Sequence, residues 1–222
     1  RPELAQVHFN LGVALKAQGR REEAIASYDK ALSLLPDFVE ARWSSAVSRI
    51  PVAYGPGDSP SDCRAEFATA LAELDKWFCA ERVKEGYKAV GSQQPFHLAY
   101  QEEDNRDLLS RYGALCFRLM GDWLQRQELS PAGNASNRRT GVGIVSSHFC
   151  NHSVWHALLE GWLQNLDRSR FELHLFYLGT THDDQTSFAR RNASTFSHGK
   201  GGLKQWVEAI LARQLDVLIY PE

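Results

Sequence analysis

The hydrophobic pattern of this chain changes its period near residue 140. Beyond that point three short apolar segments are typical of buried strands, namely TGVGIVSS, FELHLFYLG and LDVLIYPE. Two segments with helical spacing lie between them, SVWHALLEGWLQNL and LKQWVEAILARQ. Strands that alternate with helices form parallel β-α-β units with right-handed crossovers. We therefore expect residues 140–222 to fold as an open α/β lobe.

The first fifty residues have a helical period instead. Residues 1–36 form two helical blocks separated by AQGRRE, and their small and large residues follow tetratricopeptide spacing, with Gly12 and Ala24 where two helices pass closely. A second unit, FVEARWSSAVSR, is broken by IPVAYGPGDSP. One repeat cannot bury both faces of a solenoid, so we expect residues 1–50 to be the last repeats of a longer array.

Residues 51–129 are predicted to form a helical connecting region. Ser59-Pro60 is a helix start signal, and the residues after it recur at helical spacing: Phe67, Leu71, Leu74 and Phe78. A second long helix is indicated by Leu108, Tyr112, Leu115, Leu119 and Trp123. The polar segment SPAGNASNRR, residues 130–139, is the predicted linker to the α/β lobe.

Composition argues against several classes of partner. The 27 acidic and 25 basic residues are mixed along the chain, so there is no basic stripe for nucleic acid. No apolar stretch approaches the roughly 20 residues that span a bilayer, and there is no secretory core. The four cysteines include no C-x-x-C pair and are expected to be reduced. We expect a cytoplasmic chain, and a piece of a longer protein, since it lacks an initiating Met and ends on an apolar run.

The segment GIVSSHFCNHSVWH, residues 143–156, places three histidines where the first strand gives way to a helix. Ligands of open α/β sheets bind outside the carboxyl ends of the strands, which is where this loop is expected. Histidines at i, i+4 and i+8 could share a zinc ion on one helical face. However, a helix that begins near Ser153 leaves His148 in the loop, and no H-E-x-x-H motif is present. We expect no metal site.

Two interpretations of His152 stay open from the residues alone. Beside a helix N-terminus the dipole disfavours a charged ring, and a neutral imidazole can accept a proton or orient a substrate hydroxyl. Alternatively, His152 only satisfies free amides at the helix start. For His156, one turn inside, a packed helix residue is the simpler interpretation.

Taken together, the tetratricopeptide helices and the motifs GVGIVSSHFCNHSVWH, FELHLFYLG, DDQTSFARR and LDVLIYPE resemble the O-linked N-acetylglucosamine transferases, specifically the bacterial SPINDLY-like members. The segment QPFHLAYQEEDNRDLLSRYGAL is similar to the connecting helical region of those proteins. The family fuses a tetratricopeptide superhelix to a GT-B catalytic region with two Rossmann-like lobes. The resemblance implies that residues 140–222 are the incomplete start of the N-terminal Rossmann-like lobe.

The resemblance also implies an activity, the inverting transfer of N-acetylglucosamine from UDP-GlcNAc to Ser or Thr hydroxyls of proteins. No cofactor or metal is implied. The family's active-site histidine falls on His152, and we expect Asn151 and His156 to contact substrate. A C-terminal lobe absent from this sequence would bind the nucleotide, so the fragment alone is expected to be inactive. Two departures are His148, where an aspartate is common, and His198, where animal members have an acidic residue.

Alternatives to this function stay open. The chain could be a tetratricopeptide scaffold without catalysis, or a related enzyme that uses GDP-fucose as donor or asparagine as acceptor. Acceptor proteins or peptides are the expected partners, with no nucleic acid and no membrane. Tetratricopeptide arrays often associate through exposed helix faces, so a homo-oligomer is also left open.

Overall fold

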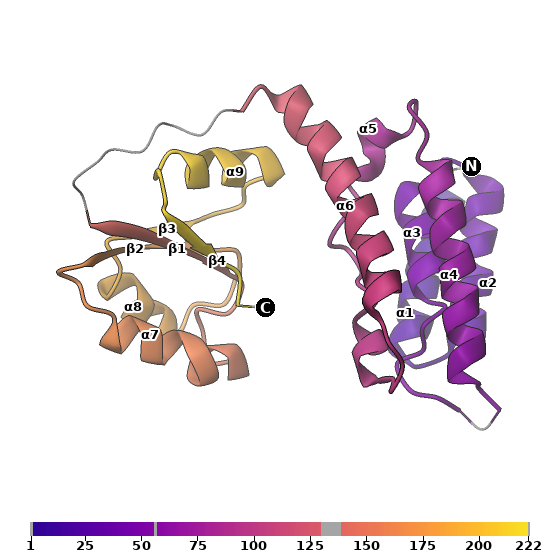
Figure 1. Ribbon diagram of the computed structural model, residues 1–222, viewed down its shortest axis with the longest axis horizontal. Helices are drawn as coiled ribbons and strands as arrows, with labels where there is room; N and C mark the ends of the chain where they lie inside the picture. The colour runs from indigo at the N-terminus through magenta and orange to yellow at the C-terminus, as the bar shows by residue number, and fades with distance from the viewer. Residues whose placement is uncertain (1, 56, 130–138, 222) are drawn as a thin grey trace. The chain divides into compact units, whose positions relative to one another are not determined.

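The computed structural model describes residues 2–55, 57–129 and 139–221. By its internal contacts the chain divides into two compact units, residues 1–126 and residues 127–222 (Figure 1). Residues 130–138 of the expected linker lie outside the described residues. Within the described ranges, no helix is both long and apolar enough to cross a bilayer.

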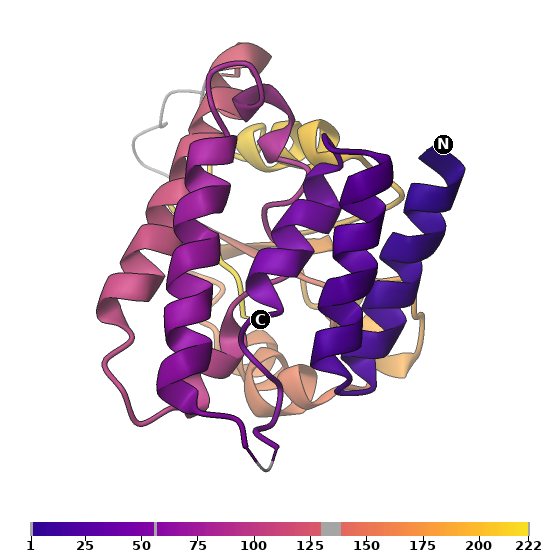
Figure 2. The ribbon, with the colours of Figure 1, turned by 90° about the vertical axis from the view of Figure 1, so that its right-hand side faces the viewer.

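The helical unit begins with a hairpin of two helices, α1 (Pro2–Ala17) and α2 (Arg21–Leu34), which lie side by side (Figures 1 and 2). Helix α1 ends because Gly19 takes a positive φ of 76°, which lets the Arg20 amide donate to the Leu15 carbonyl at 3.0 Å. The side chains of Leu15, Ala24 and Tyr28 are buried between the two helices. The sequence prediction of two helices that pass closely at Gly12 is confirmed.

The rest of this unit packs around one apolar core. Its elements are α3 (Val39–Val47), α4 (Pro60–Trp77), α5 (Val83–Gly86), the 3-10 turn η1 (Phe96–Tyr100) and α6 (Arg106–Gln127). Helix α4 begins as its start signal predicts, because the Ser59 hydroxyl accepts the Asp62 amide at 3.3 Å. The buried core includes Trp43, Phe67, Leu71, Leu74, Phe78, Leu115 and Leu119.

Replacement of Gly12 by alanine is expected to destabilise this unit. A Cβ there would lie 2.5 Å from Cε1 of Tyr28, whose ring is fully buried and cannot move freely. Overpacking of this kind costs about 1–3 kcal/mol of unfolding free energy. Gly113→Ala in α6 is the matched control, because a Cβ there meets nothing within 4 Å and alanine favours the helix. Urea unfolding should show that Gly113→Ala is more stable than the wild type and that Gly12→Ala is less stable. Equal stabilities of the two variants would contradict the close approach of the helices at Gly12.

The second unit is an α/β lobe built on a parallel four-stranded sheet. Its strands are β1 (Thr140–Ser146), β2 (Phe171–Tyr177), β3 (Thr195–His198) and β4 (Val217–Ile219), in the order β3-β2-β1-β4. Strands β1 and β2 pair over seven residues, from Thr140 opposite Phe171 to Ser146 opposite Tyr177. The expected helical region followed by an α/β lobe is therefore confirmed.

Helices cover both faces of this sheet. A π-helical turn, η2 (Trp155–Leu159), continues into α7 (Glu160–Asn165), which shares one face with α8 (Asp184–Arg191) (Figure 1). Helix α9 (Leu203–Leu211) lies on the other face. The change of face follows from the strand order, because right-handed crossovers toward opposite edges of a sheet lie on opposite faces.

Three details differ from the sequence prediction. The segment LDVLIYPE was expected to be a buried strand, but Val217 and Leu218 are 44% and 38% exposed. The reason is that β4 lies at the edge of the sheet and pairs only with β1 among the described strands. Helix α8 and the short strand β3 escaped the periodicity argument, since both are mostly polar. The expected helix does begin at Ser153, but its next turn is π-helical.

Candidate functional site

The carboxyl ends of the four parallel strands meet at one edge of the sheet. The loop after β1, residues 147–152, leaves this edge where the strand order reverses, because β2 lies on one side of β1 and β4 on the other. A crevice outside such a reversal is the usual ligand position in open α/β sheets. The fold thus puts this loop at the position favoured for a site.

Histidines concentrate at this edge. Five of the eight in the chain lie in its loops, at a strand end or in the first helical turn: His148, His152, His156, His182 and His198. Their contacts divide them into three groups. In the described part of the chain, no three His, Cys, Asp or Glu side chains come together as metal ligands.

His152 is half-buried at the start of the helix that follows β1. Its Nδ1 accepts a hydrogen bond from the Val154 amide at 3.2 Å, so the ring caps the helix. A neutral ring that accepts at Nδ1 carries its proton on Nε2, and Nε2 is then a donor. The ring also stacks on His148, with centroids 3.7 Å apart and planes 7° from parallel. The imidazole is therefore fixed in orientation and in tautomer.

Asn151 and His156 form a second group. His156 Nε2 lies 2.9 Å from Asn151 Oδ1, and His156 Nδ1 lies 3.3 Å from a carboxylate oxygen of Glu160. Both Asn151 and His156 are exposed. The three expected site residues therefore lie in one loop and the helical turn after it. They do not form one cluster, because Asn151 contacts His156 whereas His152 stacks on His148.

A third group was missed by sequence reasoning. His182, in the loop after β2, packs edge-on against His198 at the end of β3, with ring centroids 4.6 Å apart. His198 Nε2 lies 3.2 Å from the Gly179 carbonyl. The Tyr177 ring lies beside both histidines, and burial raises the pKa of its hydroxyl. The signal that could have found this pair is that both residues lie near a strand's carboxyl end.

Asp183 anchors the loop that carries His152. One carboxylate oxygen accepts the Asn151 amide at 2.7 Å, and the other accepts the Thr186 amide at 2.9 Å, which caps α8. These two amides lower the pKa of the carboxyl. The Thr186 hydroxyl donates to the Phe149 carbonyl at 2.6 Å, a second tie between α8 and the same loop.

Asp183→Asn is expected to remove an acid-sensitive part of the lobe's stability. Because the folded pKa lies below the ordinary value of 3.8, the ionised carboxylate stabilises the fold above that pH, and this contribution is lost as pH falls through the folded pKa. Asparagine keeps a capping oxygen but not the charge. Urea unfolding should show the variant less stable by up to about 1 kcal/mol at neutral pH, the size of a negative charge at a helix N-terminus, with a smaller difference at pH 3. A difference independent of pH would contradict this role.

Comparisons with known proteins agree with this architecture. A family model, the tetratricopeptide repeat, matches residues 5–38, which contain most of α1 and all of α2. No curated protein sequence matches the chain. Among solved structures, a mutant O-GlcNAc transferase from Thermobaculum terrenum is similar with a TM-score of 0.56 and 17% sequence identity. The similarity covers 98% of this chain and 39% of that protein's chain.

These findings define a class by its fold. The chain has a tetratricopeptide hairpin, a connecting helical region and a parallel α/β lobe, and its fold is similar to that of part of a bacterial O-GlcNAc transferase. At 17% identity this similarity concerns the fold. Tetratricopeptide repeats commonly bind other proteins, which agrees with the expectation of protein partners.

Proposed function

We propose that this chain is the acceptor-side part of a glycosyltransferase that transfers N-acetylglucosamine from UDP-GlcNAc to Ser or Thr hydroxyls of proteins. The observation that carries the proposal is the His152 loop at the carboxyl edge of β1, in a lobe that follows a tetratricopeptide hairpin. In this arrangement the helical repeats bind the acceptor polypeptide, and the loop after β1 faces its hydroxyl.

The proposed chemistry is an inverting displacement. The acceptor oxygen forms a bond to C1 of the sugar, the bond from C1 to the phosphate oxygen breaks, and the acceptor proton passes to a base. With Nδ1 engaged by the Val154 amide, His152 has a donor at Nε2. We therefore assign His152 a hydrogen bond from Nε2 to a substrate oxygen, which orients that oxygen or stabilises its developing charge. Because Nε2 carries the proton in this tautomer, we do not assign His152 as the base that takes up the acceptor proton.

Asn151 and His156 are proposed to contact substrate from the same loop and helical turn. Their side chains are exposed, and Asn151 Oδ1 lies 2.9 Å from His156 Nε2. A ligand that binds one of these side chains would therefore also change the hydrogen bonding of the other. The nucleotide is proposed to bind mainly to a C-terminal lobe that lies outside the 222 residues of this sequence. No cofactor is needed by this displacement, since the donor is already activated by its diphosphate.

The test is transfer of labelled N-acetylglucosamine from UDP-GlcNAc to mixed proteins by the full-length protein. Transfer to Ser or Thr supports the proposal. GDP-fucose as donor, and release of label by an asparagine-specific glycosidase, distinguish the related activities. Failure with both donors, together with no affinity for UDP, would favour the second candidate, a scaffold without catalysis. The tetratricopeptide match and three exposed apolar residues on α1, Leu4, Val7 and Leu11, are the observations that favour this candidate.

A further inference from the structure

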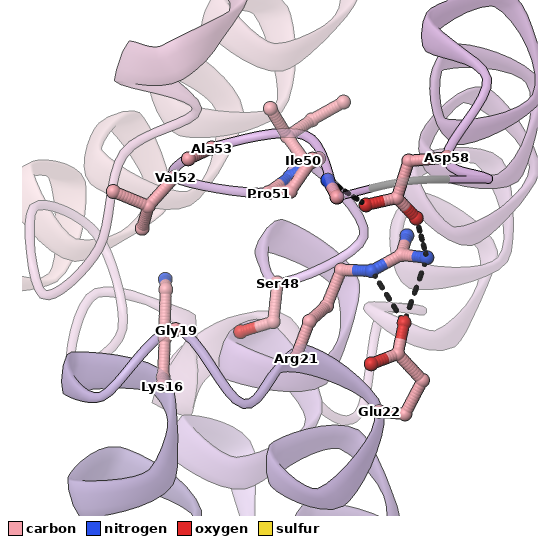
Figure 3. A pocket seen from close by; sticks show the side chains of 11 residues that line it. Lys16, Gly19, Arg21, Glu22, Ser48, Ile50, Pro51, Val52, Ala53 and Asp58 are labelled. Atoms are coloured by element: carbon pink, nitrogen blue, oxygen red, sulfur yellow. Dashed lines mark hydrogen bonds and ion pairs between the residues drawn. The ribbon is translucent and has the colours of Figure 1, made fainter.

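A pocket of about 220 Å³ lies within the helical unit, far in sequence from the histidine loop. Its walls are the turn between α1 and α2, the end of α3, residues 50–53, Gly55 and Asp58 (Figure 3). Three features of this pocket point to a ligand: a cation without an ion-pair partner, a buried hydroxyl without a hydrogen-bond partner among the described residues, and an apolar wall opposite both.

The cation is Lys16. Its side chain is half-buried, and burial lowers the pKa of the ammonium. The ammonium donates one hydrogen bond to the side-chain oxygen of Gln93, and no carboxylate of the described residues pairs with it. An ammonium has three donors, so two remain for a ligand. A partly desolvated cation that lacks an ion-pair partner is unfavourable for the fold, and an anion bound directly to it would relieve this.

The hydroxyl belongs to Ser48, which is only 2% exposed. Within the described residues its Oγ has no hydrogen-bond partner. Burial raises the pKa of the Tyr28 hydroxyl, and the nearby Ser48 hydroxyl has a smaller, opposite effect on it. Neither hydroxyl has a hydrogen-bond partner within the described residues. Figure 3 shows the Ser48 hydroxyl and the Lys16 ammonium directed into the same space. A buried hydroxyl of this kind is unfavourable unless a ligand accepts its proton.

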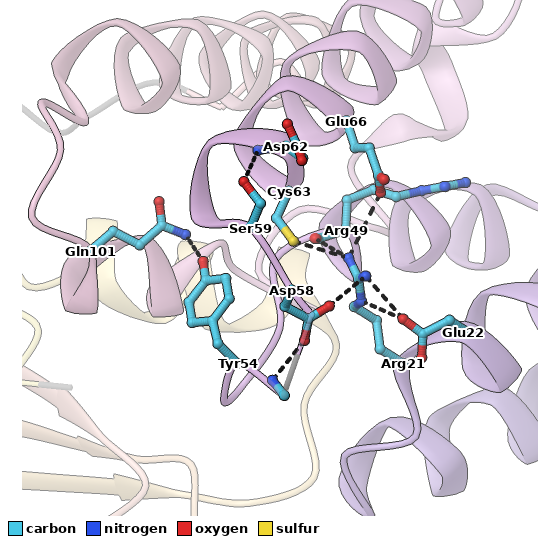
Figure 4. A network of polar contacts seen from close by, with 11 residues as sticks. Arg21, Glu22, Arg49, Tyr54, Asp58, Ser59, Asp62, Cys63, Glu66 and Gln101 are labelled. Atoms are coloured by element: carbon cyan, nitrogen blue, oxygen red, sulfur yellow. Dashed lines mark hydrogen bonds and ion pairs between the residues drawn. The ribbon is translucent and has the colours of Figure 1, made fainter.

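The acidic side chains at the rim of the pocket share one guanidinium, that of Arg21. Arg21 pairs with Asp58 at 3.2 Å and with Glu22 at 2.9 Å, and it reaches Glu66 at 3.7 Å (Figure 4). Asp58 also accepts the Gly55 amide at 2.7 Å. These contacts fix the rim. Among the charged residues that line the pocket, Lys16 is the one without an ion pair in the described structure. The apolar wall is formed by residues 50–53, Ile-Pro-Val-Ala.

We propose that this pocket binds a monocarboxylate with a short aliphatic body. The carboxylate oxygens accept hydrogen bonds from Lys16 and Ser48, and the aliphatic part packs against Ile50, Pro51 and Val52. Such a group is found in a free short-chain acid and at the C-terminus of a polypeptide that ends in a small aliphatic residue. The pocket and its ligand are independent of the glycosyl transfer proposed above.

Calorimetric titration of the chain with propionate tests the site, with propionamide as the uncharged control of the same shape. Propionate should bind in the millimolar range, because so few atoms contribute, and propionamide should bind at least about tenfold more weakly. A short peptide that ends in a free valine carboxylate, and its amidated form, distinguish the two sources. Tighter binding of the free peptide than of propionate assigns a polypeptide C-terminus, and equal or weaker binding assigns a free acid.

Two variants locate the binding. Lys16→Met keeps the aliphatic stem and should weaken propionate binding by about tenfold or more, whereas Lys30→Met on the exposed part of α2 should leave it unchanged. Ser48→Ala should weaken binding severalfold without lowering stability, since its hydroxyl has no partner in the described structure. Equal binding of propionate and propionamide, unchanged binding in Lys16→Met, or a loss of stability in Ser48→Ala would each overturn the proposal.

Discussion

His152→Asn in the full-length protein is expected to reduce the transfer rate by about 100-fold or more while leaving the fold intact. The asparagine oxygen occupies a position close to that of Nδ1, so it can still accept the Val154 amide and cap the helix. Asparagine has no hydrogen-bond donor at the position of the His152 Nε2 atom. The expected loss is that of a donor aimed at a charge that develops in the transition state. The measurement is single-turnover transfer with labelled UDP-GlcNAc, together with urea unfolding of both proteins.

His152→Gln is the matched variant, because its amide nitrogen can reach the position of Nε2 but its oxygen does not replace Nδ1. It is expected to lose about 1 kcal/mol of stability, the size of a capping interaction, and to keep more transfer than the asparagine variant. The opposite order, with full transfer in His152→Asn and little in His152→Gln, would show that the histidine acts only as a helix cap. Donor affinity should be unchanged in both variants.

Gly179→Ala is expected to destabilise the α/β lobe by about 3 kcal/mol, the upper part of the range for overpacking. A Cβ at residue 179 would lie 2.4 Å from the backbone oxygen of Ser147 and 2.5 Å from the Tyr177 ring. Neither neighbour can move easily, since one is backbone and the other is a fully buried ring. The substitution would therefore push the loop after β2 away from the loop after β1, and so disturb the His152 loop.

The control for Gly179→Ala is Gly161→Ala in α7, where a Cβ meets nothing within 4 Å. Alanine should stabilise that helix by up to about 1 kcal/mol. Thermal and urea unfolding of the two variants should differ in opposite directions from wild type. Equal stability of the two would show that the loops after β1 and β2 separate without penalty. Transfer by the full-length Gly179→Ala protein should also fall, whereas Gly161→Ala should retain it.

Local patterns in the sequence predicted most of the regular elements. Helical spacing identified the α1–α2 hairpin, α4 and α6, and apolar runs identified β1 and β2, because each of these elements buries one continuous face. The short polar elements α8 and β3 could not be found in this way. The same rule made Val217 and Leu218 look buried, although β4 is an edge strand.

The sequence by itself determined the fold class and the position of the histidine loop, since periodicity and the strand-to-helix change are local properties. Only the tertiary structure decided which groups meet. It stacks His152 on His148 and engages Nδ1, ties Asn151 to Asp183, and brings His182 to His198. It also places Lys16 beside Ser48 in one pocket. Such pairings depend on how chain segments fold back on one another, and no local spacing encodes that distance.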